Sequence, residues 1–217
     1  MSRKKAGVLL AGCGYLDGSE IHEAVLTLLY LDQAGVEAVC MAPNIPQAHV
    51  IDHQFGSEAS DERNVLTEAA RIARGEILDL SEVDPDQLDA LVIPGGFGVA
   101  KNLCTFAFDG TEMSVREDVA RLVQNIHGAG KPIGAWCIAP ALIAKLLPGT
   151  TLTIGDDADT AGAMESLGAK HQPCTVGNVI VDGDRRIVTT PAYMLGPWIA
   201  DIAKGIEEGV QQLVKML

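Results

Sequence analysis

Basic residues are few in this sequence, and long apolar runs are missing. Its 16 Lys and Arg stand against 29 Asp and Glu, which gives a formal net charge of −13. A nucleic-acid backbone or an anionic membrane surface would repel such a chain. The first apolar run, Ala6 to Ala11, is too short for a signal segment or a transmembrane helix. We therefore predict a cytoplasmic protein with neither nucleic-acid nor membrane partners.

Closely spaced cysteine pairs are also absent. The five cysteines, at positions 13, 40, 104, 137 and 174, are odd in number and form no Cys-x-x-Cys pair. This spacing argues against a disulfide framework and a zinc knuckle. His49 and His53 are four residues apart, but no third ligand stands nearby, so we interpret them as a solvated pair. The sequence predicts no metal and no cofactor.

Strand and helix patterns alternate along the chain, without a repeat, a linker or a low-complexity tract. Short apolar runs predict buried strands, and longer runs with a period of 3.6 residues predict helices. Strands are expected at 6–11, 37–42, 77–80, 88–93, 132–136, 151–154, 179–181 and 187–190, and helices at 20–34, 64–74, 114–129, 139–147, 158–167 and 197–217. This order predicts one domain, residues 1–217, with a three-layer, flavodoxin-like α/β fold and a mainly parallel sheet.

Capping signals predict where two of the helices begin. Ser19 is a good N-cap for the first helix, and Ser114-Val-Arg-Glu117 has the pattern of a capping box. Segments 44–60 and 99–113 hold no period, and we expect both to be irregular. Segment 99–113 includes Asn102 and is expected to lie near the functional site.

The stretch from Pro132 to Pro140 ends a predicted strand and begins a helix, with Cys137 between them. A sharp turn of this kind holds its central side chain above the carboxyl edge of the sheet. A thiol there feels the positive end of the helix dipole, which favours the nucleophilic thiolate. Cys137 is therefore a candidate nucleophile, although this stretch by itself fits a buried small hydrophobic residue equally well.

Acidic residues open the first long helix at the same edge of the sheet. Glu20 is the candidate partner of Cys137, although a carboxylate in a first turn is commonly only a complement to the helix dipole. Glu23 lies three residues further and shares roughly the face of Glu20. His22 lies about 200° around the helix from Glu20, which makes it a weaker, supporting candidate.

Two glycine-rich loops follow predicted strands. Pro94-Gly95-Gly96-Phe97-Gly98 would let backbone N–H groups approach a ligand, and the N–H of Gly96 could form an oxyanion hole with that of Ile138. A tight turn that needs positive φ explains each glycine equally well. The loop from Gly12 to Gly18 has Asp17 where a dinucleotide loop needs its third glycine, so we exclude a nucleotide site there.

Four motifs spread along the chain carry a resemblance to a known family. They are Gly18-Ser-Glu-Ile-His-Glu-Ala-Val25, Val92-Ile-Pro-Gly-Gly-Phe-Gly98 with Lys101-Asn-Leu103, Cys137-Ile-Ala-Pro140 and Thr189-Thr-Pro-Ala-Tyr-Met194. Their combination resembles the PfpI superfamily and, within it, the ElbB group of sigma cross-reacting or isoprenoid-biosynthesis glyoxalase proteins. The resemblance implies a class I glutamine amidotransferase-like fold and a cytoplasmic homodimer. It also implies Cys137 as nucleophile, Glu20 as its carboxylate, and a cofactor-free glyoxalase activity that turns glyoxal into glycolate and is linked to removal of glycation adducts.

The chain departs from this family pattern at two places. Ile138 stands where PfpI proper has a histidine, and Pro191-Ala-Tyr193 occupies the place of the His-x-Glu pair of amidotransferases. A peptidase or glutaminase needs an imidazole to protonate its leaving group, whereas an α-oxoaldehyde has no such group. These departures favour a small reactive aldehyde as the substrate.

The resulting hypothesis is a glutathione-independent glyoxalase. The Cys137 thiolate adds to the aldehyde, the N–H groups of Gly96 and Ile138 hold the oxyanion, and Glu20 moves a proton through an enediol. Supporting roles are expected for Gly95, His22 and Asn102. Two other readings stay open: a redox-sensing or chaperone-like protein that uses an oxidisable Cys137 without significant turnover, and a catalytically idle interaction subunit.

Overall fold

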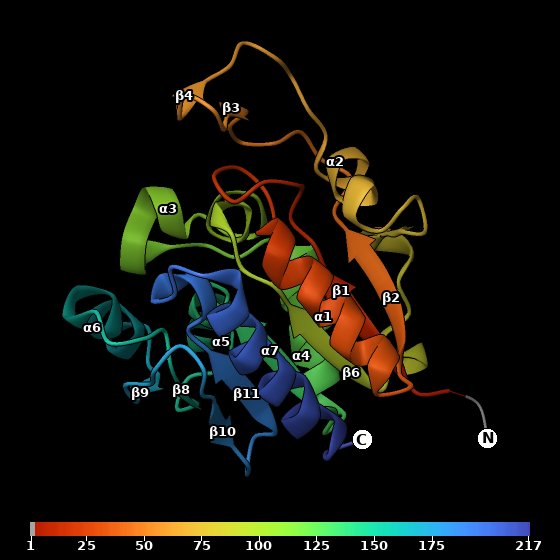
Figure 1. Ribbon diagram of the computed structural model, residues 1–217, viewed down its shortest axis with the longest axis vertical. Coiled ribbons are helices and arrows are strands. Elements are labelled where there is room, and N and C mark those ends of the chain that lie inside the picture. The colour runs from red at the N-terminus through yellow and green to blue at the C-terminus, as the bar shows by residue number, and fades with distance from the viewer. Residues whose placement is uncertain (1–2) are drawn as a thin grey trace.

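A seven-stranded sheet runs through the middle of the computed structural model, which describes residues 3–217 (Figure 1). The strand order is β10-β11-β7-β6-β1-β2-β5, and every pair is parallel except β10 with β11. The strands are β1 (Lys5–Leu9), β2 (Glu37–Ala42), β5 (Leu78–Asp79), β6 (Ala90–Ile93), β7 (Ile133–Trp136), β10 (Ile180–Asp182) and β11 (Ile187–Thr190). The predicted mainly parallel α/β fold is confirmed.

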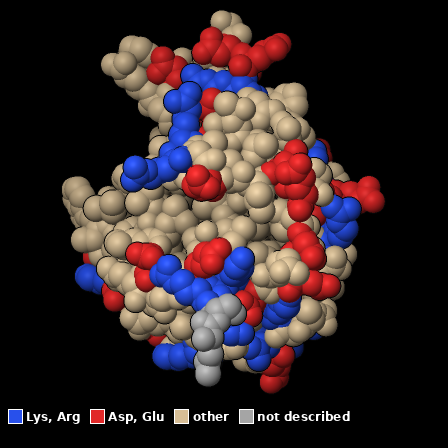
Figure 2. All heavy atoms as spheres, turned by 90° about the vertical axis from the view of Figure 1, so that its right-hand side faces the viewer, with Lys and Arg blue, Asp and Glu red and all other residues tan. Residues whose placement is uncertain are grey.

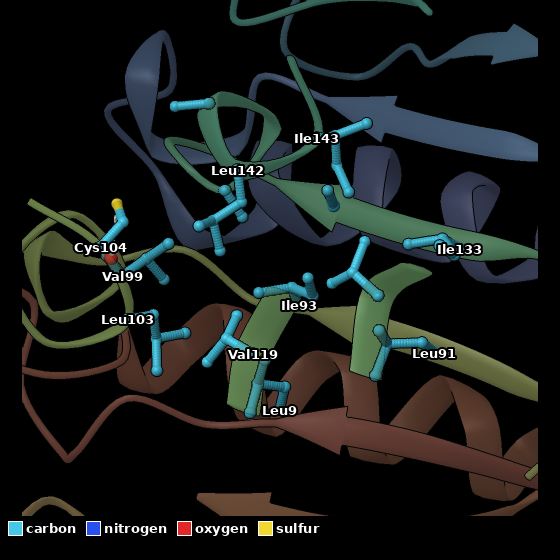
Figure 3. Packing of buried hydrophobic residues seen from close by; sticks show 14 of the residues in the cluster. Leu9, Leu91, Ile93, Val99, Leu103, Cys104, Val119, Ile133, Leu142 and Ile143 are labelled. Atoms are coloured by element: carbon cyan, nitrogen blue, oxygen red, sulfur yellow. Dashed lines mark hydrogen bonds between the residues drawn. The ribbon is translucent and has the colours of Figure 1, made fainter. Parts of the chain in front are cut away.

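Helices cover both faces of the sheet and make the three layers. On one face lie α1 (Ile21–Gln33), α2 (Val65–Ile72) and α7 (Ile199–Val214), and on the other lie α4 (Glu117–Gly128) and α5 (Pro140–Leu146). Successive strand side chains point to opposite faces, so Val8 packs toward α1 and α7 whereas Leu9 packs toward α4 and α5. Figure 3 shows part of the core between the sheet and helices α4 and α5. Leu9, Leu91, Ile93 and Ile133 come from the strands, and Val119 and Leu142 come from the helices.

Smaller elements surround this framework. They are β3 (Ile51–Asp52) and β4 (Ser57–Glu58), the one-turn α3 (Phe106–Asp109), the pair β8 (Thr151–Leu152) and β9 (Lys170–His171), and α6 (Ala158–Ser166). Figure 1 shows the β3–β4 hairpin projecting from the top of the molecule. Segments 44–60 and 99–113, predicted as irregular, therefore contain a short hairpin in the first case and a π-helical turn, Val99–Leu103, with α3 in the second.

Both predicted helix caps are wrong by one or more residues. Helix α1 is capped by Glu20, whose carboxylate accepts the N–H of Glu23 at 2.8 Å. The buried Ser19 hydroxyl instead accepts the N–H of Ala11 at 2.8 Å, because the turn before α1 folds back on the end of β1. Helix α4 begins at Glu117, while the N–H of Ser114 donates to the Thr105 hydroxyl at 2.9 Å. In both cases the serine hydrogen-bonds a residue from another part of the chain and does not cap the helix.

The chain reverses direction across the sheet between β1 and β6. After β1 it builds β2 and β5 on one side, and it then returns to build β6, β7 and β11 on the other side. Connections that leave two neighbouring strands toward opposite faces open a crevice at the carboxyl ends of those strands. The loops after β1, β6 and β7 therefore meet at one place, which carries the candidate site.

Candidate active site

Cys137 forms a strained turn between β7 and α5. Its φ angle is 58°, a left-handed conformation that costs a residue with a Cβ about 1–2 kcal/mol. The N–H of Cys137 donates to Thr190 O at 3.0 Å, which ties the turn to β11. Only 8% of the residue is exposed. The predicted strand, sharp turn and helix are confirmed, and the turn aims the thiol into the crevice at the sheet edge.

Glu23, rather than Glu20, is the carboxyl group that contacts the thiol. Its side chain is completely buried and hydrogen-bonds Cys137. One carboxylate oxygen accepts the N–H of Gly95 at 2.8 Å and the other accepts the N–H of Tyr193 at 3.2 Å. Burial, with the nearby charge of Glu20, raises the pKa of Glu23 to about 8 despite these two N–H donors. Glu23 therefore holds a proton at neutral pH, next to the sulfur.

The sulfur of Cys137 also receives two backbone donors. The N–H groups of Gly96 and Ile138 both donate to it, and each lowers the pKa of the thiol. Burial, and the charge of Glu23 once that carboxyl group is ionised, act in the opposite direction and hold the pKa of Cys137 well above its ordinary value. The sequence-based expectation of a thiolate favoured by the helix dipole is thus outweighed by loss of solvent. Thiolate formation depends on these two N–H groups and on the Glu23 proton.

Two glycines after β6 allow the loop to approach the thiol. A methyl group added at Gly95 would lie 2.8 Å from a Glu23 oxygen and 3.0 Å from the Cys137 sulfur. Gly96 has a φ angle of 99°, and a methyl group there would overlap the backbone of Gly18 and Glu20. Glycine is required at both positions for the backbone N–H groups to face the site.

Glu20 and His22 lie on the open side of the thiol. Glu20 lines a cavity that also contains Cys137, and burial is the main cause of its raised pKa. His22 is exposed, and its Nδ1 lies 2.7 Å from the hydroxyl of Tyr193, within hydrogen-bond distance. The structure therefore brings the predicted Glu20 into the same cavity as the thiol, whereas His22 bonds a residue of the cavity wall.

Asn102 does not line the cavity, and it instead hydrogen-bonds the backbone of the loops that surround the site. Its side chain is buried, accepts the N–H of Ala48, and donates to Ala11 O and Asp17 O, each at 2.9 Å. These bonds join the loop after β1 to the π-helical turn and to the segment before β3. Asn102 thereby fixes the loop that leads into α1 and its two glutamates.

A cavity of about 590 Å³ opens above the thiol. It is lined by Tyr15, Glu20, Gly96, Phe97, Phe106, Cys137, Ile138, Asp159, Thr160, Ala163, Tyr193 and Met194. No sequence motif marks the α3 and α6 residues of this cavity, so the sequence did not predict them. Helical spacing puts Glu23 on the face of Glu20, and only the packing of α1 against the Gly95 loop distinguishes the two.

Two classes of feature are absent from residues 3–217. No three His, Cys, Asp or Glu side chains gather there closely enough to hold a metal ion. None of the helices in the same range is long and apolar enough to cross a bilayer.

Comparisons with known proteins give relatives over nearly the whole chain, although no family model matches. The human mitochondrial protein named glutamine amidotransferase-like class 1 domain-containing protein 3 is 45% identical over 222 residues, spanning 98% of this chain and 83% of the human one. The rat mitochondrial ES1 protein homolog is 44% identical over 224 residues, spanning 99% and 84%. Among solved structures, an isoprenoid biosynthesis protein with an amidotransferase-like domain from Ehrlichia chaffeensis has a TM-score of 0.92 and 38% identity, covering 98% of this chain and 99% of its own.

Two more distant proteins carry names that describe an activity. A deglycase of Thermococcus kodakarensis is 33% identical over 113 residues, 49% of this chain and 56% of the deglycase. Glyoxalase III of Candida albicans has a TM-score of 0.61 and 16% identity, covering 97% of each chain, and this likeness shows the fold alone.

The predicted cytoplasmic location is overturned by these comparisons. The human and rat relatives, which align along nearly all of this chain, are both named as mitochondrial proteins. The prediction depended on the lack of an apolar leader in the first residues, and mitochondrial targeting segments are amphipathic rather than apolar. That absence therefore never distinguished the two compartments.

Proposed function

Because the chain belongs to the class I glutamine amidotransferase-like family that includes the ES1 proteins, within the PfpI superfamily, we propose that it is a cofactor-independent glyoxalase of the ElbB group. One observation carries the proposal: the Cys137 thiol meets a buried, protonated Glu23 and two backbone N–H groups at the edge of a cavity. The deglycase relative and the glyoxalase III fold support aldehyde chemistry. A homodimer that acts on a small aldehyde belongs to the same proposal.

The first step forms a bond between the sulfur and the aldehyde carbon. Thiolate and protonated Glu23 are the reactive form of the pair, because one shared proton avoids two buried negative charges. As the sulfur attacks glyoxal, negative charge moves from sulfur to the aldehyde oxygen. The N–H groups of Gly96 and Ile138 face the sulfur in the free protein. They are therefore placed to donate hydrogen bonds to the oxyanion that forms beside it.

The second step moves a proton between the two substrate carbons. Glu20 lines the cavity on its solvent side, so it is placed to take the proton from the first carbon and return it to the second through an enediol. The product is a thioester of Cys137 with a hydroxyacyl group. Water then cleaves the thioester, releases glycolate and restores the thiol, so no external oxidant or reductant is consumed.

Proton NMR of glyoxal consumption and glycolate formation, without added glutathione or metal, tests the scheme. Cys137→Ser is expected to abolish turnover, and Glu23→Gln to reduce kcat by about 10²–10⁴-fold because the proton partner is lost. Glu20→Gln is expected to lower kcat while Gln still accepts the N–H that caps α1.

Cys174→Ser is the control, because Cys174 is a free, half-buried cysteine that does not line this cavity. Its turnover should equal that of the wild type. Multiple turnovers that persist in Cys137→Ser would contradict the nucleophile assignment. Stoichiometric oxidation of Cys137 without aldehyde turnover in the wild type would instead support the redox-sensing alternative.

A further inference from the structure

Trp136, the last residue of β7, is completely buried and directly precedes Cys137. Its indole packs among residues of α1 and α7, and two glycines leave room for it. A methyl group added at Gly134 would lie 2.7 Å from the ring, and one added at Gly209 on α7 would lie 2.8 Å from it. Because the ring is enclosed in this way, packing sets the direction of its N–H group.

That N–H group donates to the hydroxyl of Thr27 on α1 at 3.0 Å. Thr27 is also completely buried, and its hydroxyl donates in turn to Glu23 O, the backbone carbonyl one helical turn earlier, at 2.7 Å. A hydroxyl group has one proton, so Thr27 gives it to Glu23 and accepts from Trp136. An indole N–H buried without a partner is costly, and Thr27 is the partner that the fold provides. This chain of hydrogen bonds joins the end of β7 to the backbone of Glu23.

Two contacts, one helical turn apart, therefore link α1 to the end of β7. Trp136 bonds Thr27, and the next residue, Cys137, bonds the side chain of Glu23 four positions earlier on α1. Residues four apart lie on the same face of a helix, about 6 Å along its axis. A helix that slips by one residue moves by about 1.5 Å, which is enough to break a hydrogen bond between a carboxyl group and a thiol. The first contact fixes the position at which the second can form.

The other groups that hold Glu23 belong to loops. The N–H groups of Gly95 and Tyr193 bind its two carboxylate oxygens, and these residues follow the ends of β6 and β11. Trp136 belongs to β7, which pairs with a strand on each side. A strand inside a sheet places a functional group more precisely than a loop does. The bond from Trp136 is thus the one that refers α1 to the rigid part of the fold.

We propose that Trp136 and Thr27 are positioning residues that hold Glu23 against the Cys137 thiol. Neither lines the cavity, and both act through the backbone of α1 and β7. The inference rests on the proposed function for the role of the Glu23 proton, and it adds the residues that place this proton beside the sulfur. Loss of either hydrogen-bonding group should let α1 shift and move the carboxyl group away from the thiol.

A titration of Glu23 tests its placement without reference to turnover. Carboxyl-carbon NMR of glutamate-labelled protein should show Glu23 titrating near pH 8 in the wild type, and the signal is assigned by its absence in Glu23→Gln. Thr27→Val keeps the shape of the side chain and removes the hydroxyl. It should move the titration to lower pH by about one unit or more, because the displaced carboxyl group is better solvated. Thr27→Ser, which keeps the hydroxyl, should titrate as the wild type does.

Three other ionisable groups lie close enough to Glu23 to influence this titration. They are the carboxyl group of Glu20, the thiol of Cys137 and the phenol of Tyr193. Thr27→Val and Thr27→Ser keep all three, so a difference between these two variants reports the position of Glu23.

Thr150→Val is the matched control. Thr150 is completely buried and its hydroxyl donates to a backbone carbonyl, Leu147 O, at 2.7 Å, as that of Thr27 does. It follows α5 at the opposite end from Cys137, so its loss should lower stability and leave the Glu23 titration unchanged.

Turnover of glyoxal supplies a second measurement. Thr27→Val should lower kcat by about 10–10²-fold with little change in KM, because a small misplacement of a reacting group slows the chemical step. Trp136→Phe removes the indole N–H from the other end of the bond and should shift the Glu23 titration in the same direction, even if Thr27→Val fails to fold.

Each result supports or contradicts a stated claim. A less stable Thr27→Val protein in which Glu23 titrates as in the wild type would show that the two residues only pack the core, and would overturn the positioning role. An equal shift in Thr150→Val would overturn it as well. A titration that Thr27→Val shifts and Thr27→Ser retains, in a protein that turns over no aldehyde, would support the positioning role and overturn the glyoxalase.

Discussion

Glu23 is the residue on which the chemistry of the site depends. It is one of few fully buried acidic side chains, and its two N–H partners, from Gly95 and Tyr193, belong to loops after two different strands. Burial, with the nearby charge of Glu20, raises the pKa of Glu23, because an ionised carboxylate without solvent is costly. The proton that Glu23 holds is therefore a consequence of its place in the core.

The raised pKa of Glu23 predicts how the free energy of unfolding depends on pH. The ordinary pKa of the carboxyl is 4.5, and in the folded protein the pKa of Glu23 is about 8. Between these values the folded state holds a proton that the unfolded state has released, so the stability conferred at low pH is lost as pH rises toward 8. We expect this group to lower the free energy of unfolding by up to about 1.4 kcal/mol per pH unit.

Urea unfolding of wild type and Glu23→Gln at pH 5, 6, 7 and 8 measures this effect, because the variant lacks the titrating group. The wild type should lose stability relative to the variant as pH rises. If the free energies of unfolding of the wild type and of Glu23→Gln change with pH in parallel across this range, Glu23 is ionised in the folded protein.

At the scale of elements, the site exists because the loop after β6 passes close to both α1 and the turn after β7. Gly96 has positive φ and packs against the backbone of Gly18 and Glu20. In that conformation its N–H lies near the Cys137 sulfur and lowers the pKa of the thiol. The loop and the start of α1 therefore position each other, and a change in one displaces the other.

Substitution of two glycines separates backbone strain from packing. Gly96→Ala should lower the free energy of unfolding by more than 3 kcal/mol, about 1 kcal/mol from positive φ and the rest from overlap with backbone. Gly35→Ala is the control, because Gly35, just after the end of α1, also has positive φ, 74°, but has no atom within 4 Å of the added methyl group. It should cost only about 1 kcal/mol. Equal losses in chemical denaturation would rule out the packing argument.

At the scale of the whole molecule, the dominant feature is an excess of negative charge. The net charge is −13, and on the face shown in Figure 2 acidic and basic side chains are interleaved. Exposed ion pairs such as Arg3 with Asp32 contribute little, because solvent surrounds both partners. We therefore expect repulsion among the surplus carboxylates to exceed the attraction of these pairs.

Added salt should accordingly stabilise the protein. Raising ionic strength from about 0.01 M to about 0.1 M shortens the Debye length from about 30 Å to about 10 Å, which screens the long-range repulsion. Thermal unfolding should shift upward by about 2–4 °C, corresponding to about 1 kcal/mol. An equal osmolarity of glycerol controls for solvent effects that do not depend on charge, and a fall in Tm with salt would show that local ion pairs dominate.

Much of the fold follows from local signals in the sequence. The apolar run that ends at Trp136 is too short for a helix and is followed by a helix-compatible run, so the position of Cys137 at the strand end follows from chain geometry. The glycines at 95 and 96 likewise follow an apolar run, β6, that is too short for a helix. What parallel strands place at their carboxyl ends is determined by the order of residues along the chain.

Only the tertiary structure decided which groups meet the thiol. Glu20 and Glu23 stand one helical turn apart with the same chemistry, and the choice between them depends on how α1 lies against the Gly95 loop. The sequence likewise did not reveal that the pKa of the Cys137 thiol is raised. The dipole of α5 is a local property, whereas burial is set by the whole fold. The cavity, too, depends on α3 and α6, which are distant in sequence. Backbone periodicity is local, and desolvation and contact are not.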